Sequence, residues 1–203
     1  MRILATVLAG TLIAVPCLAQ SLDPARAPLS RADQTFAIQA ANGGRLEVAL
    51  GGMAERQGGT VAVKDFGKHM VLDDRVANAT LARIATRNEI ALPQRQGGVA
   101  AAIRDRLVAE SGLDFDRDYV HTALWLQKNA VALFEAEART GRNLVLRRFA
   151  KTTLPVLRQH LKMADALEAD IEQHALHLST FAAPAAAPPG SQTGSRPGLE
   201  SHR

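Results

Sequence analysis

Apolar residues recur in steps of three and four along four long segments of this chain, the spacing that lines one face of an α-helix. Capping residues and glycine breaks mark where each helix is expected to begin and end. The expected helices run from Ser30 to the Gly58-Gly59 break, from Thr60 to about Asn88, from Asp114 or Asp116 to Thr140-Gly141, and from Asn143 to about Leu178. A weaker helical stretch covers Gly98 to Glu110. Sustained alternation of apolar and polar residues is missing, so strands are not predicted.

The lengths of the connections predict how these helices are arranged. The first two long helices and the last two are each joined by a very short glycine-containing turn, so each pair is expected to form an antiparallel hairpin. A much longer stretch, which includes the weaker helix, separates the two hairpins. Such a connection can run back along the bundle, and this gives an all-α, ferritin-like four-helix bundle with a long crossover. An up-and-down bundle with a bulky loop is the alternative.

Residues 1–19 have the three-part layout of a secretory signal peptide. Arg2 supplies the positive start, Ile3 to Val15 the apolar run, and the residues up to Ala19 a small-residue exit. The apolar run is shorter than the ~20 residues that a membrane-spanning helix needs. Pro16 precedes Cys17, where a lipoprotein signal carries a small residue. We therefore expect cleavage after Ala19 and a periplasmic or secreted protein without a lipid anchor.

The expected mature chain has three regions: a leader over 20–29, the helical bundle over 30–181 and a tail over 182–203. The tail is rich in alanine, proline, glycine and serine, which bury too little apolar surface to order a backbone, so we expect it to be disordered. Cleavage would also remove Cys17, the only cysteine of the sequence. Disulfides and thiolate chemistry are then excluded from the mature protein.

The charge pattern argues against nucleic acid as a partner. The formal net charge is +4, acidic and basic residues are interspersed, and aromatic residues make up 4% of the chain. This is typical of a solvated helical surface, and it leaves few rings on which bases could stack. No transmembrane segment is expected after processing, so any association with the envelope would be peripheral. The sequence does not indicate which partner the protein has.

Each of the four long helices has an apolar seam, the line of apolar residues along its inner face. Four polar residues interrupt these seams at positions where an apolar residue is expected: Glu47, Asp74, Gln127 and His160. Counting residues from the hairpin turns at 1.5 Å per residue brings all four within roughly 10 Å along the bundle axis. Burying two carboxylates and an imidazole without partners would cost several kcal/mol. Either they pair with one another, with Glu47 or Asp74 holding His160, or they bind something, or the seams are rotated towards water.

The same four residues are the candidate metal site, with a purely structural polar layer as the alternative. Glu47, Asp74, Gln127 and His160 can together ligate a hard divalent ion, although glutamine is a poor ligand for transition metals. The Glu-x-x-His motif of di-iron carboxylate proteins does not occur in the sequence. Ser-His-Asp and phosphate-loop patterns are likewise missing, so we predict no catalytic residues and no organic cofactor.

Several motifs resemble one bacterial family of exported domains of unknown function, whose members are often labelled outer-membrane or periplasmic proteins. The resemblance covers roughly residues 31–167 and implies a ferritin-like helical bundle. The motifs that carry it are AANGG with EVALG (40–51), FGKHMVLDDRVAN (66–78), VALFE (131–135) and TLPVLRQH (153–160). The family has no established activity.

The family pattern has a Glu in the first long helix, an Asp-His pair in the second, and a His in each of the last two. Glu47 and His160 match this pattern, whereas Asp74 and Gln127 stand where the family has histidines. A redox enzyme is therefore not favoured. The first hypothesis is a non-catalytic periplasmic bundle that acts in envelope upkeep or stress tolerance through binding. The alternative is a metal-binding ferritin-like protein that sequesters or oxidises an ion at a degenerate site inside the bundle.

Overall fold

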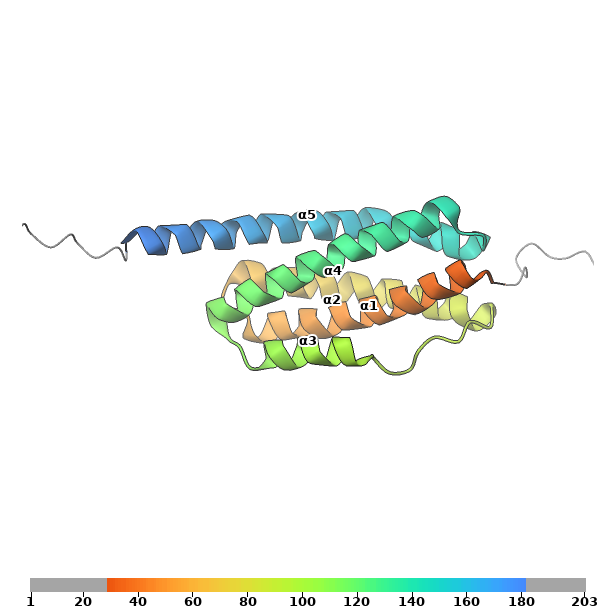
Figure 1. Cartoon of the computed structure of the whole chain (residues 1–203), viewed down its shortest axis with the longest axis horizontal. Helices are drawn as coiled ribbons and strands as arrows, with labels where there is room; N and C mark the ends of the chain where they lie inside the picture. The colour runs from red at the N-terminus through yellow and green to blue at the C-terminus, as the bar shows by residue number, and fades with distance from the viewer. Residues whose placement is uncertain (1–28, 182–203) are drawn as a thin grey trace, which may run out of the picture.

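The computed structural model describes residues 29–181, and this part of the chain is a bundle of α-helices (Figure 1). The all-α prediction is confirmed, since the β pairing of these residues is limited to one isolated bridge, between Gly58 and Gly112. The predicted signal peptide (1–19), the leader up to residue 28 and the tail (182–203) lie outside the described residues. The helices are α1 (Arg31–Gln57), α2 (Val61–Arg87), α3 (Gly98–Val108), α4 (Gly112–Thr140) and α5 (Leu144–Phe181).

The connectivity is that of two antiparallel hairpins joined by a crossover. Helix α1 packs most extensively on α2, and α4 packs most extensively on α5. The bridge between Gly58 and Gly112 brings the start of α4 beside the α1–α2 turn, where α2 also begins. Helices α2 and α4 therefore run in the same direction, and the segment with α3 runs back along the edge of the bundle from the end of α2 to the start of α4 (Figure 1). The two-hairpin prediction is confirmed, and the up-and-down alternative is wrong.

The predicted first residues are confirmed for three of the four long helices. The Ser30 hydroxyl accepts a hydrogen bond from Asp33 N at 3.1 Å, and Thr60 Oγ1 accepts one from Val63 N at 3.3 Å. Asn143 Oδ1 caps α5 by accepting from Leu146 N at 3.0 Å. Each bond satisfies a backbone donor that the first turn leaves free.

The expected start of α4 at Asp114 or Asp116 is wrong, because the helix begins earlier, at Gly112. Gly112 has a φ of 63°, in the left-handed region that glycine enters at little cost. Serine and glycine thus turn the chain into the helix before the first aspartate is reached. Asp116 has a different role, at the turn of the other hairpin.

The two hairpins are an internal repeat. Asp33 corresponds to Asp116 at a spacing of 83 residues, and the same spacing relates further residues. These pairs are Phe36 and Tyr119, the VAL triplets at 48–50 and 131–133, Gly58 and Gly141, and Phe66 and Phe149. The two glycines end α1 and α4 in closely similar conformations, with φ and ψ of −57° and 143° in one and −56° and 135° in the other. The helix starts and turns of one hairpin are thus repeated in the other.

Hydrogen bonds across the two hairpins follow the same repeat. The Asp116 carboxylate accepts from the backbone N–H groups of Gly59 at 2.7 Å and Thr60 at 2.8 Å. The Asp33 carboxylate accepts from the corresponding groups, Arg142 at 2.9 Å and Asn143 at 3.3 Å. The first helix of each hairpin thus fixes the turn of the other. The bundle therefore has an approximate twofold axis across its long axis.

The apolar core consists of two clusters, one in each half of the bundle, which the twofold axis relates. One cluster includes Phe66 and Tyr119, whose ring centroids lie 6.1 Å apart. The other includes Phe36 and Phe149, the corresponding residues, with ring centroids 6.3 Å apart. The level between these clusters is where the apolar seams carry polar residues. The fold thus positions a polar layer near the middle of the bundle.

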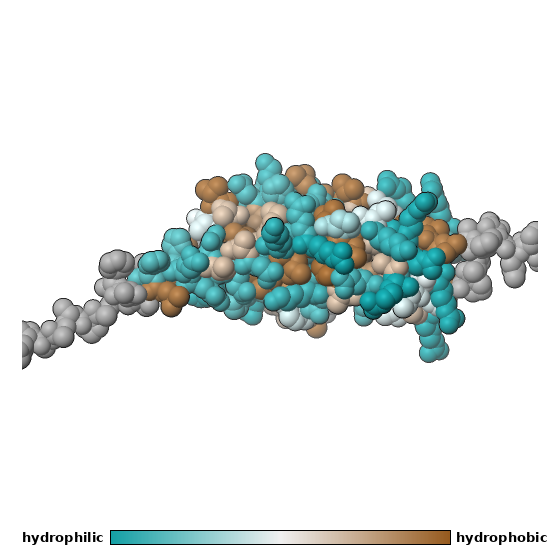
Figure 2. All heavy atoms as spheres, turned by 90° about the horizontal axis from the view of Figure 1, so that it is seen from above, coloured by the Kyte–Doolittle hydropathy of each residue, from teal (hydrophilic) through white to brown (hydrophobic). Residues whose placement is uncertain are grey.

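The surface of the described bundle is mixed in character. Seen from above, hydrophobic patches alternate with hydrophilic side chains (Figure 2). Within residues 29–181, none of the helices combines the length and the hydropathy needed to cross a membrane.

Candidate binding site in a buried polar layer

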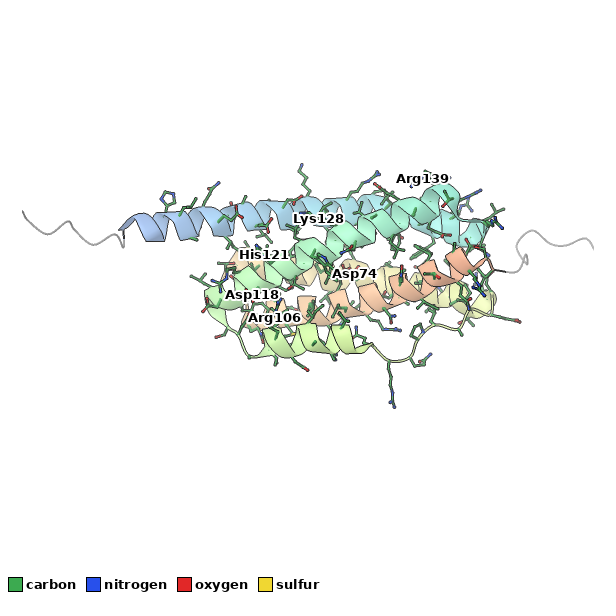
Figure 3. All side chains as sticks on the ribbon, viewed as in Figure 1. Asp74, Arg106, Asp118, His121, Lys128 and Arg139 are labelled. Atoms are coloured by element: carbon green, nitrogen blue, oxygen red, sulfur yellow. The ribbon has the colours of Figure 1, made fainter. Side chains whose placement is uncertain are left out.

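The four polar residues that interrupt the seams are all buried. Their exposed fractions are 6% for Glu47, 4% for Asp74, 0% for Gln127 and 1% for His160. They come from α1, α2, α4 and α5, one from each long helix, and Asp74 lies near the middle of the bundle (Figure 3). The seams are therefore not rotated towards water. The polar groups must find partners inside the protein or in something that it binds.

Three of these residues form a chain of contacts. Gln127 Nε2 donates to Glu47 Oε1 at 3.1 Å and also contacts Met70 Sδ at 3.7 Å. The carboxyls of Glu47 and Asp74 are hydrogen-bonded to each other. Because two carboxylates repel, such a contact requires a proton between them.

Burial controls the ionisation of this carboxyl pair. Removal from water raises the pKa of Glu47 well above its ordinary value, the charge of Asp74 raises it further, and the bond from Gln127 opposes the rise. Burial also raises the pKa of Asp74, to about 7, with a further rise from Asp73 and an opposing effect of the bond from Glu47. Burial and mutual repulsion thus act in the same direction on the pair, which keeps a proton more readily than either acid would in water.

His160 has a different partner from the two that the sequence suggested. Its Nε2 lies 2.9 Å from Asp73 Oδ2, so the expected bond to Glu47 or Asp74 is wrong. Asp73 immediately precedes Asp74, and both line a cavity between α2 and α5. The Asp73 side chain is 49% exposed, so it contacts the imidazole from the outer side of the bundle. The spacing of apolar residues places His160 on the inner face of its helix. It cannot decide whether Asp73 or Asp74 is the partner of the imidazole.

Three buried atoms of the layer have no hydrogen-bond partner among the described residues: Asp74 Oδ2, Gln127 Oε1 and His160 Nδ1. An unmade hydrogen bond at a buried polar atom costs about 1–3 kcal/mol. Such atoms in one layer indicate a place where a small group can be held. Within residues 29–181, however, no three His, Cys, Asp or Glu side chains converge as a metal ion would require. Metal binding by Glu47, Asp74, Gln127 and His160 stays a prediction.

A cavity of about 330 Å³ adjoins the polar layer. Glu47 and Asp74 are the acidic residues of its lining, Gln39, Asn78, Asn129 and Thr153 are neutral polar residues, and most of the remaining wall is apolar, including Leu133, Phe134 and Phe149. Trp125 also lines the cavity while 57% of it is exposed, so it stands at the mouth. A mostly apolar cavity with a few convergent polar groups is the usual form of a small-molecule site.

The internal repeat explains why a cavity lies here. The counterparts of the four polar residues at the 83-residue spacing are Ala130 for Glu47, Leu157 for Asp74, Gly44 for Gln127 and Ala77 for His160. All four counterparts line the cavity. The space is therefore where a second copy of the polar group would lie, and small or apolar side chains leave it open. The 83-residue repeat is the sequence signal from which this cavity could be predicted.

A second cavity, of about 270 Å³, lies between α2 and α5. It shares Asp74, Ala77, Phe149, Thr153 and Leu157 with the first. Asp74 therefore lines both cavities, and it is the polar residue best placed to meet a ligand.

Comparison with known proteins identifies the family but no characterised relative. Residues 18–167 match the model of a domain of unknown function, DUF4142. No curated protein and no solved structure matches the chain. The matched segment covers most of the sequence, including all four residues of the polar layer. The chain therefore belongs to this family of proteins of unknown function.

Proposed function

We propose that this protein is a non-catalytic binding protein of the periplasm, which takes a small and largely apolar molecule into the cavity beside Glu47 and Asp74. The observation that carries the proposal is the cavity itself, about 330 Å³ with apolar walls and one polar side. Asp74 lines the cavity and is 4% exposed, so its carboxyl can fix the orientation of a ligand. The signal-peptide layout of residues 1–19 supports export. Holding such a molecule would serve envelope upkeep or stress tolerance.

The test uses Trp125, the only tryptophan of the sequence and a residue at the cavity mouth. Cyclohexanol, a neutral compound small enough for the cavity, is titrated into the mature protein while tryptophan emission is followed. We expect a saturable change with a Kd of about 1 mM or tighter, given the few atoms of the probe. Loss of emission change in a variant with a filled cavity would locate the site.

Gly43→Leu is the variant that fills the cavity. Gly43 lines the cavity, and a Cβ added to it meets nothing within 4 Å, so the helix accommodates the change. Gly98→Leu is the matched control, because Gly98 is also a helical glycine with open space around it but lies in α3, away from the cavity. We expect Gly43→Leu to weaken binding about tenfold or more and Gly98→Leu to leave it unchanged. Equal responses in all three proteins would refute the proposed site.

A second candidate function, binding of a divalent metal ion, is favoured by one arrangement. The Asp73 carboxylate contacts His160 Nε2 and leaves Nδ1 buried without a partner, as when a carboxylate orients a metal-ligating histidine. Asp74 Oδ2 and Gln127 Oε1 would supply oxygen ligands. Zinc or magnesium ions should then raise the melting temperature of the wild type, because a ligand stabilises the state that binds it. His160→Leu should abolish that rise.

A further inference from the structure

We propose that the ligand of this cavity is a small organic ammonium ion, with its charged nitrogen on Asp74 and Glu47 and its hydrocarbon body against the apolar wall. This inference rests on the proposed function, since it concerns the same cavity. It adds the chemical class of the ligand, which cavity volume and apolar lining alone do not give.

The acidic wall has no counter-charge of its own. Neither Glu47 nor Asp74 forms an ion pair within residues 29–181, and no arginine or lysine influences the ionisation of either carboxyl. Asp74 lines the cavity from α2, beside Glu47 from α1. A buried carboxylate is stable only with a donor or a cation beside it. An ammonium group supplies both.

The groups that face this pair from the other helices do not change the sign of the local charge. From α4, Gln127 is neutral, and Tyr119 is kept protonated because burial, and then the charges of Glu47 and Asp74, raise its pKa. From α5, His160 is held by Asp73, itself an acid on α2. An organic anion would therefore meet repulsion here, whereas a cation meets attraction.

The apolar part of the lining favours an ammonium ion over a bare metal ion. Besides the neutral polar residues Gln39, Asn78, Asn129 and Thr153, the cavity is lined by side chains such as Ala77, Ala130 and Leu157, which offer no oxygen or nitrogen ligands. A metal ion needs donors around most of its coordination sphere. An alkylammonium ion needs donors only at its nitrogen and an apolar surface for its hydrocarbon part. Phe134 and Phe149 add apolar surface for that hydrocarbon part.

The test compares three probes with the same six-membered ring: cyclohexylamine, cyclohexanol and cyclohexanecarboxylate. Binding to the wild-type mature protein at pH 8 is followed by Trp125 emission and by calorimetry. We expect the amine, which is protonated as lysine is, to bind about tenfold more tightly than the alcohol, and the carboxylate to bind more weakly than either. At pH 5.5 Asp74 gains a proton, so the preference for the amine over the alcohol should shrink.

Asp74→Asn is the decisive variant, because it keeps the shape of the side chain and removes its charge. It should abolish the preference for the amine over cyclohexanol. Asp65→Asn is the control, since Asp65 is an exposed residue of the same helix. Glu47→Gln is a second variant that removes the other carboxyl, so that the inference stays testable if Asp74→Asn fails to fold.

The outcomes separate this inference from the proposed function. If cyclohexanol binds the wild type as tightly as the amine does, or if both carboxyl variants keep the preference for the amine, the ammonium assignment is wrong and the cavity remains a binding site. If no probe changes Trp125 emission in the wild type, both are overturned. A preference for the amine that both carboxyl variants lose, and that Asp65→Asn keeps, supports the inference.

Discussion

At the scale of single residues, the raised pKa values of Glu47 and Asp74 link the site to the stability of the protein. Both carboxyls have a pKa raised by burial, to about 7 for Asp74, whereas in the unfolded chain they titrate near 4. The folded state therefore holds protons that the unfolded state releases between about pH 4 and pH 7. The stability that this pair contributes is present below pH 4 and is lost as the pH rises through 7.

Asp74→Asn should remove part of this pH dependence. One pKa unit corresponds to about 1.4 kcal/mol, so we expect the variant to be more stable than the wild type at pH 8 by about 1–3 kcal/mol and to differ little from it at pH 4. Urea unfolding at the two pH values measures the difference. Some slope remains in the variant, because burial, and then Asp33, raise the pKa of Glu137 to about 7 as well. A wild type that is less stable at pH 4 than Asp74→Asn would contradict this assignment.

At the scale of helices, the carboxylates that cross between hairpins determine how the two halves assemble. Asp33 and Asp116 are each 1% exposed, and each accepts two backbone hydrogen bonds from the turn of the opposite hairpin. The helices themselves could be predicted from the sequence, because their caps and apolar spacing are local signals. The role of Asp116 could not, because its partners at Gly59 and Thr60 are distant in the chain and look like ordinary turn residues.

Asp116→Asn should destabilise the bundle by about 1–2 kcal/mol, because hydrogen bonds to a charged acceptor are stronger than those to an amide. Asp33→Asn should have an effect of similar size, because Asp33 makes the corresponding hydrogen bonds to the other turn. Chemical denaturation at pH 7 measures both, with the exposed Asp65→Asn as the reference. Our description of the hairpin contacts would fail if Asp116→Asn were no more destabilising than the reference.

At the scale of the whole molecule, the approximate twofold axis explains both the polar layer and the cavity. The sequence predicted the positions of Glu47, Asp74, Gln127 and His160 because each interrupts a helical seam, and their burial agrees with that prediction. It did not predict the cavity, which depends on what is missing at Gly44, Ala77, Ala130 and Leu157. Small residues on an apolar seam look like ordinary core positions until the second hairpin is superposed on the first.

The most direct measurement of the central claim is a crystal structure of the mature protein grown at pH 8 with cyclohexylamine. The account predicts the ring inside the cavity, against Phe134 and Phe149, with the amine nitrogen within hydrogen-bonding distance of the Asp74 carboxylate. A cavity closed by its own side chains, or an amine bound only on the outer surface, would contradict it.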